Sequence, residues 1–208
     1  MNHSLSKNRS ARASRPVHKL LAASVLLCCA HMATAQTSTM GPMSAGQSYV
    51  GINAGQSDFS RLDSGNGLYS TSSHDTAYSL TYGNYFLAPN VGMEIGYDNF
   101  GSVSRGGGSS KAQGINISFI GKIPVGTSFN FLAKLGTTYG NTDVSSQPNS
   151  GVATGTEQGF DWAYGVGAEL VINPQWSAVL QYDEHYLKFA GIDSQRVAAT
   201  TLGVRMHF

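Results

Sequence analysis

The sequence predicts an all-β fold, an eight-stranded antiparallel up-and-down transmembrane β-barrel. From Ser48 onward, apolar residues alternate with small or polar ones in eight separate segments. Long connections alternate with short ones along the chain. The positions between the apolar residues combine many glycines with a few long charged side chains, which is unusual for a solvated outer face.

The N-terminal part of the chain has the features of an export signal. Five basic residues occur before residue 20, an apolar run follows at 20–30, and Ala33-Thr34-Ala35 has the small-x-small pattern of a cleavage site. The apolar run is too short to cross a bilayer as a helix, which needs about 20 residues. We therefore expect a signal peptide over 1–35, a short periplasmic lead-in over 36–47 and a barrel over 48–208.

Composition limits the functions that the mature chain can have. Cys28 and Cys29 are the only cysteines and fall in the predicted signal peptide, which leaves no thiol for a disulfide or a metal site. The signal peptide also contains five of the 13 Lys and Arg residues and none of the 12 Asp and Glu residues. The remaining 8 basic and 12 acidic groups give a net charge of −4 with His neutral. This charge argues against a nucleic-acid partner, and we expect no metal and no cofactor.

Each alternating segment is long enough to cross a bilayer at a tilt, which takes about 9–11 residues. The predicted strands are residues 48–55, 77–86, 91–100, 115–123, 129–137, 160–172, 176–183 and 201–208.

The connections assign the two ends of the barrel. Three are short and contain Pro89, Pro124 or Pro174, which suits tight turns. The four others are rich in Gly, Ser, Asn and Thr and span about 58–75, 101–113, 140–159 and 184–195. Short periplasmic turns, longer outer loops and an even strand number are typical of outer-membrane barrels. We expect four mobile outer loops and both termini on the periplasmic side.

The two faces of the strands have opposite chemistry. The apolar face has aromatic residues near the strand ends, as a lipid-facing surface requires: Tyr97, Phe129, Tyr139, Trp162, Trp176, Tyr182 and Phe208. The opposite face is small and polar, which suits the narrow interior of an eight-stranded barrel.

Three segments carry a family resemblance: "NVGMEIGYDNFG" (90–101), "FLAKLGTTYGNTD" (131–143) and "YGVGAELVINPQWSAVLQYD" (164–183). They resemble the OmpA-like outer-membrane β-barrels, often called the porin family, and the resemblance extends over the chain from Tyr49. It implies the barrel fold and a Gram-negative outer-membrane location. The periplasmic peptidoglycan-binding domain of OmpA is not expected, because the chain ends with its eighth strand.

The resemblance also implies an interior cluster of charges. Glu94, Lys134 and Glu169 match the acidic and basic positions of the family's interior salt bridges, whereas Val179 stands where the family has a further arginine. Buried carboxylates need cations, so we expect Arg205 or Lys122 to supply the missing charge. The predicted network that closes the lumen is thus Glu94, Lys122, Lys134, Glu169 and Arg205.

The last eight residues, "TLGVRMHF", are predicted to be the closing strand, paired with "SYVGINAG" at 48–55. They resemble the C-terminal sorting signal of outer-membrane proteins, with Thr201, Gly203, Met206 and Phe208 in the characteristic positions. We expect the barrel-assembly machinery to bind this strand by edge pairing.

We expect no catalytic residues. Eight-stranded lipid A-modifying enzymes use His with Ser and a carboxylate, but His74, His185 and His207 are scattered along the sequence. The "RGGGSSK" stretch at 105–111 fails the spacing of a phosphate-binding loop and is predicted to be a flexible loop tip.

The predicted function is a monomeric, non-enzymatic cell-envelope protein that makes surface contacts through its outer loops. Its expected partners are outer-membrane lipid and lipopolysaccharide, with an unidentified host or surface ligand at the loops. A narrow channel for small solutes or ions is the first alternative, and a lipid A-modifying enzyme is the second.

Overall fold

The computed structural model describes residues 48–62, 65 and 67–208. The predicted signal peptide and lead-in, with Cys28 and Cys29, lie outside the described residues. No helix in the described part of the chain is long and apolar enough to cross a membrane.

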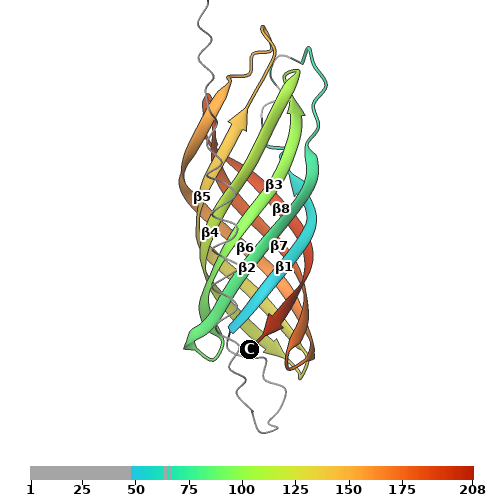
Figure 1. The fold of residues 1–208 in the computed structure, drawn as a ribbon, viewed down its shortest axis with the longest axis vertical. Coiled ribbons are helices and arrows are strands. Elements are labelled where there is room, and N and C mark those ends of the chain that lie inside the picture. The colour runs from blue at the N-terminus through green and yellow to red at the C-terminus, as the bar shows by residue number, and fades with distance from the viewer. Residues whose placement is uncertain (1–47, 63–64, 66) are drawn as a thin grey trace, which may run out of the picture. The chain divides into compact units, whose positions relative to one another are not determined.

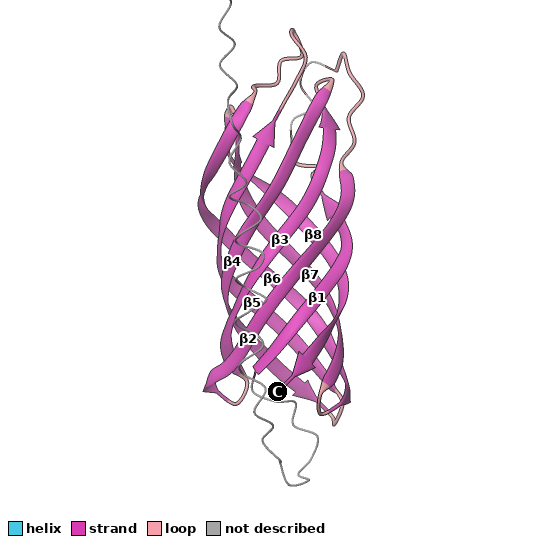
Figure 2. Cartoon of the chain, viewed as in Figure 1, coloured by secondary structure: helices cyan, strands magenta, loops and turns pink. Residues whose placement is uncertain are grey.

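The described residues form a closed antiparallel barrel in which each strand pairs with the next along the chain (Figures 1 and 2), which confirms the predicted fold class. The strands are β1 (Ser48–Asp58), β2 (His74–Ala88), β3 (Val91–Arg105), β4 (Gly108–Val125), β5 (Phe129–Val144), β6 (Gly155–Asn173), β7 (Trp176–Phe189) and β8 (Ile192–His207).

Pairing of the last strand with the first closes the barrel, as the sequence predicts. Their register matches Val50 with Met206 and Ile52 with Val204. At the C-terminus, the backbone N–H of Phe208 donates to Ser48 O at 3.0 Å, and Ser48 N–H donates to Phe208 O at 3.3 Å. Closure leaves no free edge at this seam, which a strand in lipid requires because its backbone groups cannot bond to water.

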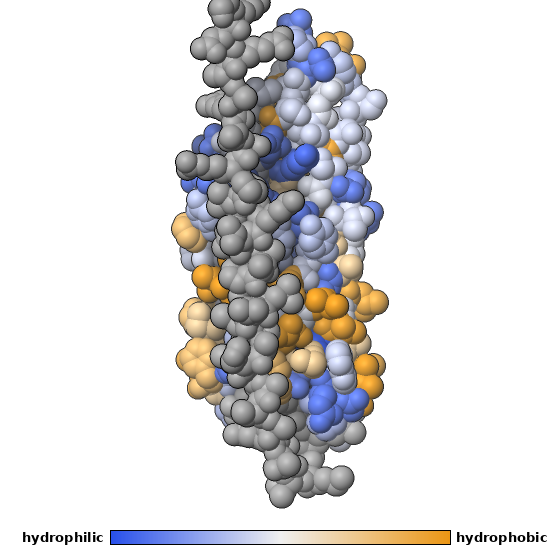
Figure 3. Space-filling model, viewed as in Figure 1, coloured by the Kyte–Doolittle hydropathy of each residue, from blue (hydrophilic) through white to orange (hydrophobic). Residues whose placement is uncertain are grey.

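Exposed outward and buried inward side chains alternate along the strands. Trp162 is 67% exposed and Ile52 is 59% exposed, whereas Ile120 and Val179 are fully buried. On the face that Figure 3 shows, apolar residues gather over the half that contains the C-terminus, and hydrophilic residues cover the other half. We call these the turn end and the loop end of the barrel.

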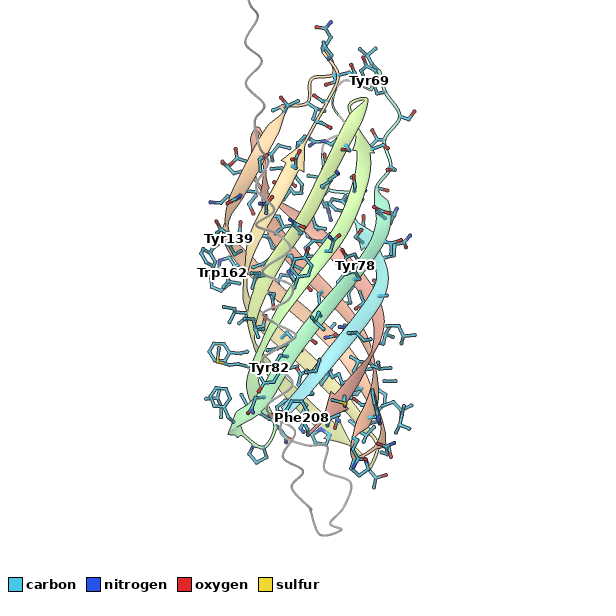
Figure 4. The ribbon with its side chains drawn as sticks, viewed as in Figure 1. Tyr69, Tyr78, Tyr82, Tyr139, Trp162 and Phe208 are labelled. Carbon is cyan, nitrogen blue, oxygen red and sulfur yellow. The ribbon has the colours of Figure 1, made fainter. Side chains whose placement is uncertain are left out.

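Tyrosine residues mark the boundary of the apolar belt toward the loop end. The hydroxyl of Tyr97 donates to Gln113 at 2.9 Å, and that of Tyr139 donates to Gln158 at 3.1 Å. Tyr139 and Trp162 project outward about half-way along the barrel wall, and Phe208 lies near the turn end (Figure 4). Rings that contact lipid and hydroxyls that bond to polar neighbours suit a membrane–water interface.

Two of the four predicted mobile loops are paired strands instead, so the prediction is wrong for these two. The segments 101–113 and 184–195 form paired hairpins, because β3 and β4 extend to Arg105 and Gly108, and β7 and β8 extend to Phe189 and Ile192. Gly106 and Gly107 both have positive φ, 58° and 73°, as a two-residue hairpin turn requires. Among the described residues, the longer connections without strand structure at this end are 59–62 with 67–73, and 145–154.

The β7–β8 hairpin changes course near its tip. Pairing between β6 and β7 ends at Ala163 and His185, whereas β6 continues to Gly155 alongside β5. On the hairpin, Lys188 O accepts a hydrogen bond from Thr142 of β5. The hairpin tip therefore leans toward β5 across the mouth of the barrel.

Candidate functional site: the interior of the barrel

Glu94 is at the centre of a buried polar layer. It is 2% exposed, and it lies on β3 with its side chain directed into the barrel. Its carboxylate accepts hydrogen bonds from Tyr49 Oη at 2.5 Å, Lys134 Nζ at 3.2 Å and Arg205 Nη2 at 3.0 Å. These contacts join β1, β3, β5 and β8 across the lumen.

A second buried carboxylate, Glu169 of β6, lies toward the turn end. Asn130 Nδ2 and Ser177 Oγ each donate to it at 2.8 Å. Arg205 Nη1 lies 3.7 Å from Glu169 Oε1 and His207 Nε2 lies 3.4 Å from it. Arg205 therefore faces both interior glutamates and occupies the cationic role that Val179 cannot fill.

The sequence prediction left out one carboxylate that belongs to this network. Asp183 of β7 approaches Lys134, with its Oδ1 2.9 Å from Lys134 Nζ. Lys134 thus contacts Glu94 and Asp183 together. The inward position of Asp183 in the alternating pattern was the signal that could have identified it.

Lys122 is placed differently from the prediction. Its Nζ lies 4.3 Å from the ring centroid of Tyr85, and among the described residues its side chain makes no ion pair with a carboxylate. The ring stabilises the ammonium by a cation–π contact. Four of the five predicted network residues therefore lie together, and Lys122 lies beside them against an aromatic ring.

Glycine makes room for the large side chains of this layer. A Cβ at Gly83 would lie 2.2 Å from the Tyr49 ring, and one at Gly203 would lie 2.0 Å from Asn53 Oδ1. Both distances are far below van der Waals contact. The small residues of the inward face thus permit the tyrosine to reach Glu94.

Toward the loop end the interior is apolar, which corrects the prediction of a small and polar inward face throughout. We call this cluster the apolar cap. It consists of Phe59, Leu62, Ala77, Phe100, Val103, Ala112, Val144, Val152, Leu187, Phe189, Ala190, Val197 and Ala199, with Ile192 packed against it. Outside the membrane belt the strands need a hydrophobic core as a soluble protein does, and the cap provides it.

The three described histidines, His74, His185 and His207, have different surroundings. His185 is buried, with its Nδ1 2.7 Å from Thr138 Oγ1 and its ring against Phe100. His74 is exposed; it contacts the preceding Ser73 and lies 3.8 Å from Asp58, beyond hydrogen-bonding distance. His207 faces inward and lies 2.9 Å from Ser177 Oγ. The described residues contain no group of three or more potential metal ligands.

The four residues of the proposed assembly signal lie on both faces of β8 and its end. Thr201 is buried and Gly203 faces inward, whereas Met206 and Phe208 are directed outward with 42% and 46% exposure. The aromatic terminus is therefore available at the turn end (Figure 4).

A family model described as the outer membrane protein beta-barrel domain matches residues 20–208. The chain belongs to this family. It is therefore a protein of the bacterial outer membrane. No curated protein sequence matches the chain.

Solved barrels show the same architecture. Neisserial surface protein A shares 12% identity at a TM-score of 0.57, with 78% of this chain and 98% of that chain covered. OprG from Pseudomonas aeruginosa shares 14% identity at 0.55, with 81% and 99% covered. Ail, the attachment invasion locus protein of Yersinia pestis, shares 19% identity at 0.51, with 79% and 99% covered. At these identities the likeness is one of fold.

Proposed function

We propose that this member of the family is a closed, non-enzymatic barrel that strengthens the cell envelope and presents a structured surface to the outside. One observation carries the proposal: two packed layers of different chemistry fill the interior. An open water path would leave its lining side chains accessible. Instead, Arg205 and Glu169 in the polar layer and Phe100 and Val197 in the apolar cap are at most 1% exposed.

The loop end supports the surface role. The described parts of the connections 59–73 and 145–154 lie at this end together with the two hairpin tips, and they contribute Phe59, Leu62 and Val152 to the apolar cap. Tyr69 lies in the 59–73 connection at this extremity (Figure 4). The attachment role in the name of Ail belongs to that protein, and it is compatible with a contact function here.

Conductance of the purified protein in planar bilayers tests the closed barrel. We expect no discrete current steps, because ions would have to cross both the apolar cap and the polar layer. A barrel reconstituted in parallel with a known open lumen provides the positive control. Reproducible steps from correctly folded protein would contradict the proposal and favour the narrow channel.

The lipid A-modifying enzyme is tested separately. Mass spectrometry of lipid A from a deletion strain should match the parent strain. Ser177 and Glu169 both contact the same ring nitrogen of the buried His207, and Asp58 lies 3.8 Å from His74, so neither histidine has the hydrogen bonds of a catalytic triad. A change in acyl-chain number that is restored by the wild-type gene would favour the enzyme.

A further inference from the structure

A polar cluster lies on the outside of the barrel, just above the apolar belt. Glu184 of β7 follows the lipid-facing Tyr182 on the outward face, yet it is only 7% exposed. Its carboxylate accepts hydrogen bonds from Tyr182 Oη at 2.7 Å, from Tyr164 Oη and from Arg196 Nη1 at 2.6 Å. A third ring, Tyr186, packs against Tyr164. Three tyrosines thus surround an ion pair between Glu184 and Arg196 on a surface that faces outward.

Arg196 retains donor capacity in this arrangement. Its Nε is buried without a hydrogen-bond partner, whereas 24% of the side chain as a whole is exposed. Glu184 holds one end of the guanidinium in place, so the remaining N–H groups are preorganised for an acceptor.

An apolar groove lies on the same outer wall, nearer the turn end than this cluster. It has a volume of about 740 Å³ and is lined chiefly by Ile52, Ala54, Leu80, Leu202 and Val204. The small side chain of Ala54 accounts for its depth, because its neighbours on the outward face are larger. The groove is open along the lipid-facing wall of β8, β1 and β2.

Strand register connects the groove to the polar cluster. Across β7, β8 and β1, the row Leu180, Leu202 and Ala54 is apolar, and the next outward row toward the loop end is Tyr182, Thr200 and Gln56. The row after that is Glu184, Ala198 and Asp58. The surface therefore changes within two rows from an apolar groove to a rim of donors and acceptors.

We propose that this surface binds one glycolipid of the outer leaflet, with an acyl chain in the groove and the phosphorylated sugar headgroup at the rim. The apolar belt supplies the lipid environment, and the position of the rim at its loop-end boundary selects the outer leaflet. Arg196 provides the contact to a phosphate or sugar oxygen. Thr200, Gln56 and Asp58 offer hydrogen bonds to sugar hydroxyls, and the tyrosine rings offer an apolar side to the sugar.

Native mass spectrometry of the purified, folded protein with added lipid A tests this site. We expect one lipid A molecule to stay bound, and R196Q to weaken its binding roughly tenfold, the cost of one charge-assisted hydrogen bond. A54W should weaken binding independently by filling the groove, and its outward position leaves the interior packing intact. The matched control is K111Q, which removes an exposed cation on the outward face of β4.

Two further ligands identify the chemistry that is recognised. Dephosphorylated lipid A should bind more weakly to wild type and should lose its sensitivity to R196Q, whereas inorganic phosphate alone should not displace lipid A. Equal retention of phosphatidylethanolamine and lipid A would overturn the proposal, as would wild-type binding in both R196Q and A54W. Heat-modifiable electrophoretic mobility confirms that each variant is folded. If R196Q does not fold, lipid A binding by A54W decides the test.

Discussion

At the scale of single residues, two interior carboxylates depend on Arg205. We expect Arg205→Ala to destabilise the barrel by about 3–5 kcal/mol, because Glu94 keeps Lys134 as its one cation and Glu169 keeps no arginine. The urea midpoint of the folded barrel in lipid vesicles, followed by heat-modifiable mobility, measures this loss.

The control for Arg205 is Lys122→Ala, which removes a cation that contacts a ring and leaves no buried carboxylate without a partner. Its effect should be smaller, about 0.5–2 kcal/mol. Equal effects of the two substitutions would show that interior ion pairing does not determine stability here.

At the scale of elements, β8 combines a structural and an assembly role. Deletion of Phe208 should slow folding into the outer membrane more than it lowers the stability of the finished barrel, because Phe208 adds only one terminal pairing with Ser48. Appearance of the heat-modifiable form in pulse-chase samples gives the rate. Val204→Ala changes a lipid-facing residue of the same strand outside the proposed signal and should assemble normally. Assembly of the deletion variant at the wild-type rate would exclude the aromatic terminus as a signal.

The strands also show what the sequence can and cannot predict. Alternation placed the centre of β4 correctly at 115–123, but the strand continues from Gly108 to Val125. Its first residues, "GSSKAQG", have the composition of a loop, and only pairing with β3 and β5 makes them a strand. Composition indicates solvent exposure in this segment, whereas pairing depends on neighbours that are remote in sequence.

The interior site has the same limitation. Alternation assigned Glu94, Lys134, Glu169 and Arg205 to the inward face, and all four are there. The partner of each charge depends on strand register around the whole barrel, since Arg205 and Glu94 are 111 residues apart in the chain. The contact of Lys122 with a tyrosine ring could not follow from the alternating pattern.

At the scale of the whole molecule, the barrel has two kinds of interior, one for each of the two environments that surround it. Within the apolar belt, lipid surrounds a polar layer; beyond it, water surrounds the apolar cap. Phe100→Ala should therefore loosen the loop end selectively, because a large-to-small change in such a core costs about 3–5 kcal/mol. In vesicles, trypsin should then cleave faster at Lys111 and Lys188 near the hairpin tips, whereas the membrane-embedded half should stay heat-modifiable.

Val166→Ala is the matched control for Phe100→Ala, since it shortens a lipid-facing side chain that is 61% exposed and touches neither interior. Cleavage of this variant should match wild type. Loss of the heat-modifiable form in Phe100→Ala would contradict the two-layer view, because it would mean that the cap and the polar layer unfold as one cooperative unit. Independent layers instead allow the surface exposed to the outside to open and close locally without release of the barrel from the membrane.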